Sequence, residues 1–299
     1  MKNIRYILSI LSIVLFTHSG KAQDFKGKAT YFSKTSVDLD LDGRQLSEEQ
    51  KQRIRQRVKN SSERTYVLTF DKTSSLYQQE EKLDAPTSGG QGRGRGIRVA
   101  FGALGVGAKY YKNVQDQQYL SQTEMFGKQF LISDSLNQRQ WELGPETKKI
   151  GNYTCYKATT IVEPDSLTFN RIRRMARRSQ GTGRDSTRTN TILSRIEEPS
   201  ERVVTVWYTP EIPISQGPGD YWGLPGLILE VNDGRTAILC TQIVLNAENV
   251  EEIKKPSKGK RVNQAEYDKI LAEKMEEMSE RFRNGNRRGG GNGIRIIRN

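Results

Sequence analysis

The chain has 299 residues and a formal net charge of +13, and only 34% of its residues are hydrophobic. His18 is its single histidine, and Cys155 and Cys240 are its two cysteines. Residues 23–299 therefore lack the side chains for Ser-His-Asp and Cys-His catalytic sites, for histidine-ligated zinc or haem, and for a structural zinc site. We expect no cofactor, no metal site and no catalytic residue, and the composition favours a non-enzymatic role.

Residues 1–22 have the pattern of a cleavable signal peptide. A basic start (Lys2, Arg5) leads into an apolar run at 7–16, and small residues occupy the positions −3 and −1 before Gln23. The run is shorter than the ~20 residues that cross a bilayer. We expect the remainder of the chain to work in the periplasm, at the outer membrane or as a secreted protein, with no transmembrane segment after cleavage.

Short strand patterns separated by turns run through most of the chain. In 65–70 the alternation places Tyr66, Leu68 and Phe70 on one face. Strands follow strands without intervening helices, which is typical of an antiparallel sheet and not of βαβ units. The pattern predicts a mainly β fold, one curved sheet or a partly open barrel. Further strands are expected at 25–37, 75–82, 110–113, 118–126, 128–133, 139–143, 153–162, 202–209, 227–231 and 235–245.

Two segments are expected to be helical. Ser47 and Gln50 form a capping box before a polar segment, which predicts a short exposed helix. A C-terminal amphipathic helix is predicted at 263–283, with its stop at Gly285. We expect this second helix to lie on the sheet through one apolar face, which comprises Tyr267, Ile270, Leu271, Met275, Met278 and Phe282.

The positive charge is concentrated in segments that are predicted to be loops. Seven arginines stand between 171 and 188 against one acidic residue, and the last 19 residues hold six arginines and no acidic residue. Like charges at this density are solvated. We predict one domain at 23–283 with flexible inserts near 84–108 and 164–200, followed by a flexible Gly/Arg-rich tail at 284–299.

Cys155 and Cys240 both fall in expected strands. In an oxidising compartment such a pair can form a disulfide. The alternative is two buried free thiols that act as small hydrophobic side chains. Both hypotheses stay open at this point.

A proline- and glycine-rich stretch follows the expected strand at 202–209. Leu224-Pro225-Gly226-Leu227 suits a type II turn, with glycine at the position that needs a positive φ. One interpretation is a rigid connection that buries Leu224, Leu227 and Leu229. The other is a ligand-binding surface built from four aromatic residues, namely Trp207, Tyr208, Tyr221 and Trp222.

At these residues the chain resembles the GLPGLI family of exported Bacteroidetes proteins. The hexapeptide of that name is intact, and stretches at 141–159, 208–218 and 255–270 also fit. The resemblance implies an exported protein of the envelope and carries no activity or functional residue with it. The hexapeptide comprises Gly223, Leu224, Pro225, Gly226, Leu227 and Ile228.

Four functions were weighed on these observations. The first is a non-enzymatic periplasmic or outer-membrane-associated binding or accessory protein, whose open sheet would hold an apolar ligand. The second is an envelope interaction module whose Arg-rich loops contact anionic lipid, lipopolysaccharide or an outer-membrane protein. Nucleic acid is not an expected partner of an exported chain. An enzyme using carboxylates would depend on Glu211 and Asp220, the acidic residues nearest the aromatic stretch.

Overall fold

The computed structural model describes five stretches of the chain: 25–36, 47–80, 108–162, 201–246 and 252–288, with only the backbone described at 278–288. The predicted signal peptide, the insert at 164–200 and most of the insert at 84–108 lie outside these stretches. The tail beyond residue 288 lies outside them as well.

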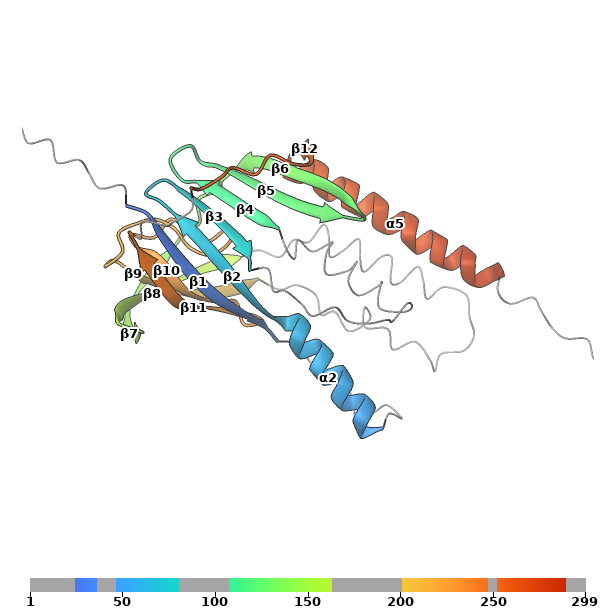
Figure 1. The fold of residues 1–299 in the computed structure, drawn as a ribbon, viewed down its shortest axis with the longest axis horizontal. Coiled ribbons are helices and arrows are strands. Elements are labelled where there is room, and N and C mark those ends of the chain that lie inside the picture. Colours follow the sequence, from blue (N-terminus) through green and yellow to red (C-terminus); the bar gives the residue numbers. More distant parts are fainter. Residues whose placement is uncertain (1–24, 37–46, 81–107, 163–200, 247–251, 289–299) are drawn as a thin grey trace, which may run out of the picture.

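Twelve strands form one sheet in the order β12-β6-β5-β4-β3-β2-β1-β11-β10-β9-β8-β7 (Figure 1). Every pairing is antiparallel except that of β12 with β6. The strands are β1 (Gly27–Thr35), β2 (Glu63–Phe70), β3 (Ser74–Gln79), β4 (Lys109–Asn113), β5 (Gln118–Met125), β6 (Lys128–Ser135), β7 (Glu142–Ile150), β8 (Tyr153–Val162), β9 (Arg202–Thr209), β10 (Leu227–Asn232), β11 (Thr236–Leu245) and β12 (Lys260–Val262).

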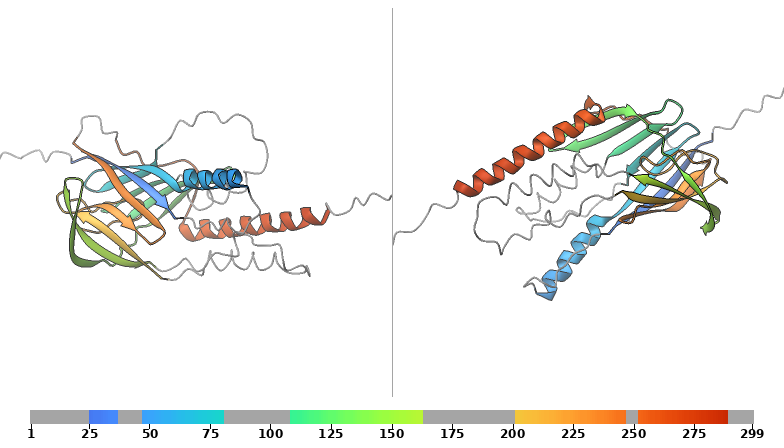
Figure 2. Two further views of the ribbon diagram at one scale, coloured as in Figure 1. Left: turned by 90° about the horizontal axis from the view of Figure 1, so that it is seen from below. Right: turned by 180° about the vertical axis from the view of Figure 1, so that it is seen from behind.

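The sheet curls strongly and its ends, β12 and β7, stay apart (Figures 1 and 2). A sheet of this many twisted strands is expected to curl, because twist accumulates from strand to strand. The predicted mainly antiparallel curved sheet is confirmed, and it is not closed into a barrel. The expected strand at 139–143 is wrong in position, since β7 begins at Glu142, and β12 was not predicted.

The inner face of the curl follows from the strand register. Phe70 pairs with Ser75, Ser75 with Lys112, and Lys112 with Tyr119, and residues directly opposite one another share a face. Phe70 and Ser75 are almost fully buried on this face. The inner face therefore runs from apolar residues on β1 and β2 to polar and aromatic ones on β4 and β5.

The largest hydrophobic cluster lies at the apolar end of the inner face. Side chains of the neighbouring strands β3, β2, β1, β11 and β10 meet Cys155 of β8 and the isoleucines Ile212 and Ile214, which lie between β9 and β10. Tyr66 and Tyr77 stack within it, with their ring centroids 4.8 Å apart. The fully buried members include Ala29, Tyr31, Leu68, Phe70, Ile212 and Leu227.

Two helices project from the sheet in the same general direction (Figures 1 and 2). Helix α2 (Glu48–Ser62) begins with the predicted capping box of Ser47 and Gln50. Helix α5 (Gln264–Arg288) lies against β5 and β6 and continues through Gly285, so the predicted stop there is wrong. Of the helices that the structure describes, neither is long and apolar enough to cross a membrane.

The apolar face predicted for the C-terminal helix is present in its described part. Tyr267 and Leu271 are buried against Phe130 of β6, and the Tyr267 and Phe130 rings meet edge to face at 5.6 Å. The helix begins with Asn263, whose side chain accepts a hydrogen bond from the Glu266 backbone N–H at 2.8 Å. This docking fixes the first turn of α5 at the polar end of the inner face.

Candidate functional site

Lys112 of β4 holds the connection between β9 and β10, which we call the 210–226 loop. The lysine is fully buried, and its Nζ donates to the carbonyl oxygens of Gly217 at 2.6 Å, Gly219 at 2.8 Å and Tyr221 at 2.9 Å. Three acceptors around one nitrogen match the three N–H donors of an ammonium group. The loop is thus folded around a buried cation.

Two effects on the protonation of Lys112 oppose one another. Burial lowers the pKa of Lys112 to about 7; Asp220 raises it again, and Arg139 lowers it further. The three carbonyl groups favour the charged form, because hydrogen bonds to a charged group stabilise it. The position of the loop and the charge of this lysine are therefore coupled.

The same loop is anchored to β3 and β10. Gln216 is fully buried, and its Oε1 accepts a hydrogen bond from Ser75 Oγ at 2.8 Å. Its backbone carbonyl accepts from the Ile228 N–H at 3.0 Å. Among the described residues, none offers an acceptor to Gln216 Nε2. The loop consequently occupies the inner side of the curl as part of the core.

The hexapeptide at 223–228 contributes to this packing. Leu224, Leu227 and Leu229 are almost fully buried, as the rigid-connection interpretation expected, and Ile228 is buried with them. The predicted type II turn is wrong: Gly226 lacks a positive φ, and its N–H donates to the Leu224 carbonyl at 2.8 Å, two residues back. Glycine is needed at 226 because a Cβ there would lie 2.2 Å from the Thr209 carbonyl oxygen.

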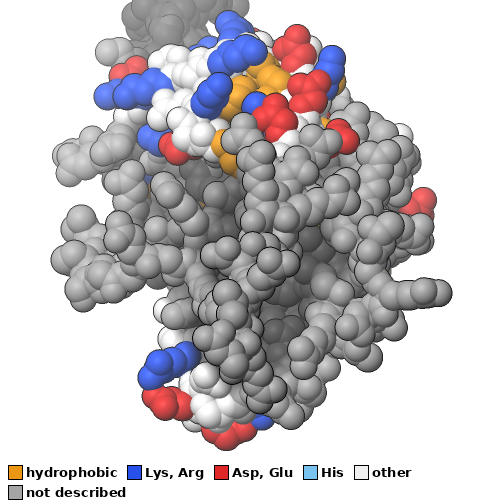
Figure 3. All heavy atoms as spheres, turned by 90° about the vertical axis from the view of Figure 1, so that its right-hand side faces the viewer, with side chains coloured by type: hydrophobic (Ala, Val, Ile, Leu, Met, Phe, Trp, Pro, Cys, Tyr) orange, Lys and Arg blue, Asp and Glu red, His pale blue; other side chains and the backbone are white. Residues whose placement is uncertain are grey.

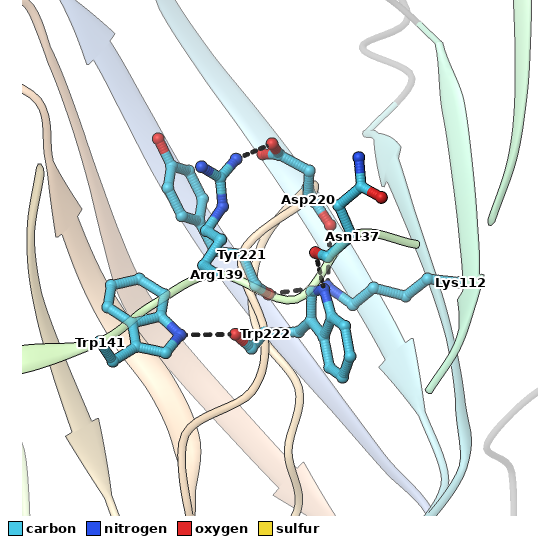
Figure 4. A network of polar contacts seen from close by, with 8 residues as sticks. Lys112, Asn137, Arg139, Trp141, Asp220, Tyr221 and Trp222 are labelled. Atoms are coloured by element: carbon cyan, nitrogen blue, oxygen red, sulfur yellow. Dashed lines mark hydrogen bonds and ion pairs between the residues drawn. The ribbon is translucent and has the colours of Figure 1, made fainter. Parts of the chain in front are cut away.

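The segment 136–141, between β6 and β7, crosses from one half of the sheet to the other and is tied to the loop (Figure 4). Trp141 Nε1 donates to the Trp222 carbonyl at 2.8 Å, and Trp222 Nε1 donates to the Asn137 carbonyl at 3.2 Å. Arg139 forms an ion pair with Asp220. Each contact joins one residue of the segment to one residue of the loop, so the segment and the loop form one connected unit.

A cleft of about 1100 Å³ opens beside this unit. Its walls come from β4 and β5 on one side and from β8 and β9 on the other, with the 136–141 segment and the first turn of α5 between them. Amide side chains line it at Asn137, Gln138, Gln140 and Gln264. Hydroxyl-bearing residues line it at Ser121, Ser135 and Thr160, and Thr159 and Ile161 contribute to the wall on either side of Thr160.

Three aromatic side chains complete the cleft: Tyr110, Tyr119 and Trp141. The Tyr110 and Tyr119 rings stack with centroids 5.2 Å apart and an interplanar angle of 14°. Tyr119 Oη donates to Gln264 Oε1 at 2.9 Å. Burial is the main cause that raises the pKa of the Tyr119 hydroxyl to about 12. Both phenols are therefore neutral hydrogen-bonding groups near neutral pH.

The four aromatic residues predicted as a ligand-binding surface do not form one surface, although Tyr208 and Tyr221 belong to the same hydrophobic cluster. Trp207 and Tyr208 are neighbours on β9 and so point to opposite faces. Lys148 Nζ lies over the Trp207 ring at 4.4 Å, and Tyr208 is buried beside Tyr156.

Tyr221 and Trp222 belong to the loop. Arg139 lies over the Tyr221 ring at 4.9 Å, and Trp222 is buried. The lining of the described cleft includes none of the four predicted aromatic residues. Ligand contact with them stays a prediction.

Glu211 and Asp220, the two carboxylates singled out from the sequence, lie in different surroundings. Glu211 Oε1 accepts a hydrogen bond from the Thr154 backbone N–H at 2.8 Å and so serves the start of β8. Asp220 lines the cleft, where it pairs with Arg139. Within the described stretches, no three His, Cys, Asp or Glu side chains form a group that could hold a metal ion.

Cys155 and Cys240 are unbonded thiols in the structure, both buried in the same hydrophobic cluster. Burial raises the pKa of Cys155 to about 11 and that of Cys240 to about 12. They act here as small apolar side chains. A disulfide between them stays a prediction.

Sequence reasoning missed Lys112 and the 136–141 segment. The alternation of Tyr110 and Lys112 in a short strand does place both on one face, but nothing local distinguishes a buried lysine from a solvated one. The segment resembles a strand end in composition. Its role depends on contacts with residues about 80 positions away in the chain.

Fold and cleft together define an antiparallel β-sheet protein with a concave polar site. The model of a family described as "Protein of unknown function (Porph_ging)" matches residues 141–230, which include β7 to β9, the loop and most of β10. Over this region the chain is similar to that uncharacterised family. Among curated proteins, no match is found.

Solved structures with some similarity include PNGF-II in two crystal forms, C2 and P21. Each has a TM-score of 0.45 and 12% sequence identity to this chain. The matches cover 83% and 82% of this chain and 32% and 33% of those chains. The chain thus spans about a third of their length, and at this level of similarity the matches carry no inference about function.

Proposed function

We propose that this chain is an exported binding protein whose cleft takes a polar ligand. The cleft itself is the observation that carries the proposal: about 1100 Å³, between two walls of one curled sheet, with side-chain amides and hydroxyls along it. Binding sites are concave and hold a few convergent polar groups. The cleft fits this description.

The proposal differs from a carrier of apolar ligands. An apolar ligand needs an apolar hollow, yet the apolar end of the inner face is filled by the 210–226 loop. Ile212 and Leu227 are fully buried there. The space that remains combines apolar surface with the side chains of amide, hydroxyl and charged residues. A ligand that carries polar groups is therefore the better match.

Export and the GLPGLI assignment belong to this proposal as well. The signal pattern at 1–22 and the hexapeptide at 223–228 support them, and the match to an uncharacterised family over 141–230 is compatible with the second. Sequencing the N-terminus of the purified protein tests export. A mature chain that begins at Gln23 is expected, and one that begins at Met1 would reject it.

The alternative role, an envelope module that contacts anionic lipid or lipopolysaccharide, depends on the Arg-rich segments at 164–200 and 281–299. Their side chains lie outside those that the structure describes. On the face shown in Figure 3, basic and acidic side chains of the described residues lie close together. This mixed face does not favour the alternative over the cleft.

Native mass spectrometry of the protein purified from its own cells tests the binding role. The wild type should carry a small-molecule adduct, and Thr160→Trp should lose it. Thr160 lines the cleft and pairs with the buried Val204 on the inner face of β8 and β9, so a tryptophan there fills the cleft. Thr147→Trp is the matched control, since Thr147 is an exposed residue of the neighbouring strand β7, outside the cleft.

Absence of any adduct from the wild type would count against the proposal. So would an adduct that Thr160→Trp retains in the same proportion as Thr147→Trp. Circular dichroism of both variants checks that the sheet is intact.

A further inference from the structure

The chemical class of the ligand follows from what the cleft offers. Its amide side chains present a carbonyl acceptor next to an NH₂ donor, and its hydroxyls both donate and accept. Asn137, Gln138 and Gln140 are exposed on the 136–141 segment. Such a lining suits a ligand whose own groups donate and accept at once, as alcohol groups do.

The charges of the cleft argue against an anion. Arg139 is its basic residue, and its guanidinium is paired with Asp220. Glu142 adds a second carboxylate, so the ionised groups of the lining sum to a small negative charge. The buried ammonium of Lys112 is turned to three backbone carbonyls. A phosphate or carboxylate ligand would find no free cation among the described lining residues.

The aromatic side of the cleft is held in place before any ligand arrives. Tyr119 stacks on Tyr110, and its hydroxyl donates to Gln264 Oε1 at 2.9 Å. Gln264 Nε2 in turn donates to Asp268 Oδ1 at 2.8 Å. A ring fixed in this way offers apolar area without a further loss of conformational entropy. It suits a ligand that has an apolar face as well as hydroxyl groups.

The strand order argues against a peptide that joins the sheet. Both edges of β5 and of β8 are occupied, and β12 pairs with the outer edge of β6. β7 has a free edge, but its ladder is irregular between Leu143 and Thr147. A peptide bound by strand addition needs a free, regular edge at the site. Recognition in this cleft therefore depends on side chains.

We propose that the cleft binds a neutral carbohydrate, with a sugar ring against Tyr119 and its hydroxyls on the side-chain amides of the 136–141 segment. This inference rests on the proposed binding function and adds the ligand class to it. Sugar rings combine an apolar C–H face with a rim of hydroxyl groups, which are the two properties that the lining matches. The carbohydrate is expected to be neutral because Arg139, the basic residue of the cleft, is already paired with Asp220.

A printed array of oligosaccharides tests the inference on the purified, full-length chain. The probes are neutral oligomers of glucose, mannose, galactose and N-acetylglucosamine, beside sialylated and sulfated oligosaccharides. Binding to at least one neutral series and weaker binding to the anionic probes are expected. The best neutral probe is then titrated by calorimetry.

Variants of Tyr119 identify the site. Tyr119→Ala removes the ring and should weaken binding by about tenfold or more, whereas Tyr119→Phe keeps the ring and should stay within about threefold. Tyr156→Ala is the matched control, because Tyr156 is an exposed tyrosine on β8 that the cleft does not include. Thermal unfolding reports on the fold of each variant.

Thr160→Trp is a second test that leaves Tyr119 unchanged, and it should abolish binding of the same probe. Preference for the anionic probes would overturn the inference, as would binding that Tyr119→Ala and Thr160→Trp leave unchanged. If no neutral probe binds while native mass spectrometry finds an adduct sensitive to Thr160→Trp, the carbohydrate class is wrong and the binding function stands. If neither experiment finds a ligand, both fail.

Discussion

The inner face of the sheet has two ends that differ in chemistry although they belong to one continuous surface. Over β1 and β2 it carries Ala29, Tyr31, Leu68 and Phe70, each fully buried. Over β4 and β5 it carries tyrosines and hydroxyl groups that line a cleft of about 1100 Å³. The 210–226 loop lies on the inner side of both ends, with Ile212 in the apolar cluster and Asp220 in the cleft.

This difference separates stability from recognition. The apolar end removes large side chains from water, which is the main favourable term in folding. The polar end keeps hydrogen-bonding groups accessible. Lys112 lies at the junction, because it pairs with Ser75 towards the apolar end and with Tyr119 towards the cleft. Variants at the two ends should therefore change different properties.

The largest expected effect is on stability, at the apolar end. Leu227→Ala should lower the free energy of unfolding by about 2–5 kcal/mol, because Leu227 is fully buried and alanine leaves a cavity. Urea denaturation measures the change. Ile161→Ala, at an exposed residue of the cleft wall, should change it by less than about 0.5 kcal/mol. Equal losses in the two variants would erase the distinction between the ends.

Lys112→Met tests the junction. It leaves the carbonyls of Gly217, Gly219 and Tyr221 without their donor, and each unsatisfied buried group costs about 1–3 kcal/mol. Removal of a buried charge offsets part of this cost. We expect a net loss of about 2–3 kcal/mol in urea denaturation and weaker binding in the cleft, since Asp220 and the 136–141 segment depend on the loop.

The pH dependence of the free energy of unfolding, compared between the wild type and Lys112→Met, sharpens this prediction. The pKa of Lys112 is about 7 in the folded chain and ~10.4 in an unfolded one. Between these values the unfolded chain binds more protons, so wild-type stability should rise from pH 7 to pH 9. Lys112→Met should lose this rise. Above pH 9 the thiols of Cys155 and Cys240, whose pKa values burial raises, reverse the trend. If the free energy of unfolding changes equally with pH in both proteins, Lys112 stays protonated in the folded chain from pH 7 to pH 9.

The fold was largely predictable because its signals are local. Alternation in β2 placed Tyr66, Leu68 and Phe70 on one face, and the structure confirms that face in the apolar cluster. The capping box of Ser47 and Gln50 also specifies its helix from neighbouring residues. The wrong stop at Gly285 has a related cause, because a single glycine in a helix costs only about 1 kcal/mol.

The cleft was not predictable from local signals. Its parts come from residues far apart in the chain, such as Tyr119 and Gln264, which are 145 positions apart. The aromatic residues that cluster in sequence, Trp207 and Tyr208, are separated by the alternation of a strand. Gly226 was correctly singled out for the wrong reason, since a close backbone approach and not a positive φ requires it.

The smallest expected effect on stability, and the most specific effect on binding, is at Asp220. Asp220→Asn keeps the shape of the side chain and leaves the charge of Arg139 unneutralised. The free energy of unfolding should change by less than about 1 kcal/mol, because the Asp220 carboxylate is half exposed.

Affinity for a sialylated trisaccharide should rise by roughly threefold to tenfold in Asp220→Asn, as an unpaired guanidinium attracts a carboxylate. Affinity for the neutral probe should stay the same. Asp233→Asn is the matched control, since Asp233 pairs with Arg202 at 3.1 Å and lies outside the cleft lining. If both variants change the preference equally, or neither does, the neutrality of the cleft does not depend on this ion pair, and selection must come from the amides and hydroxyls alone.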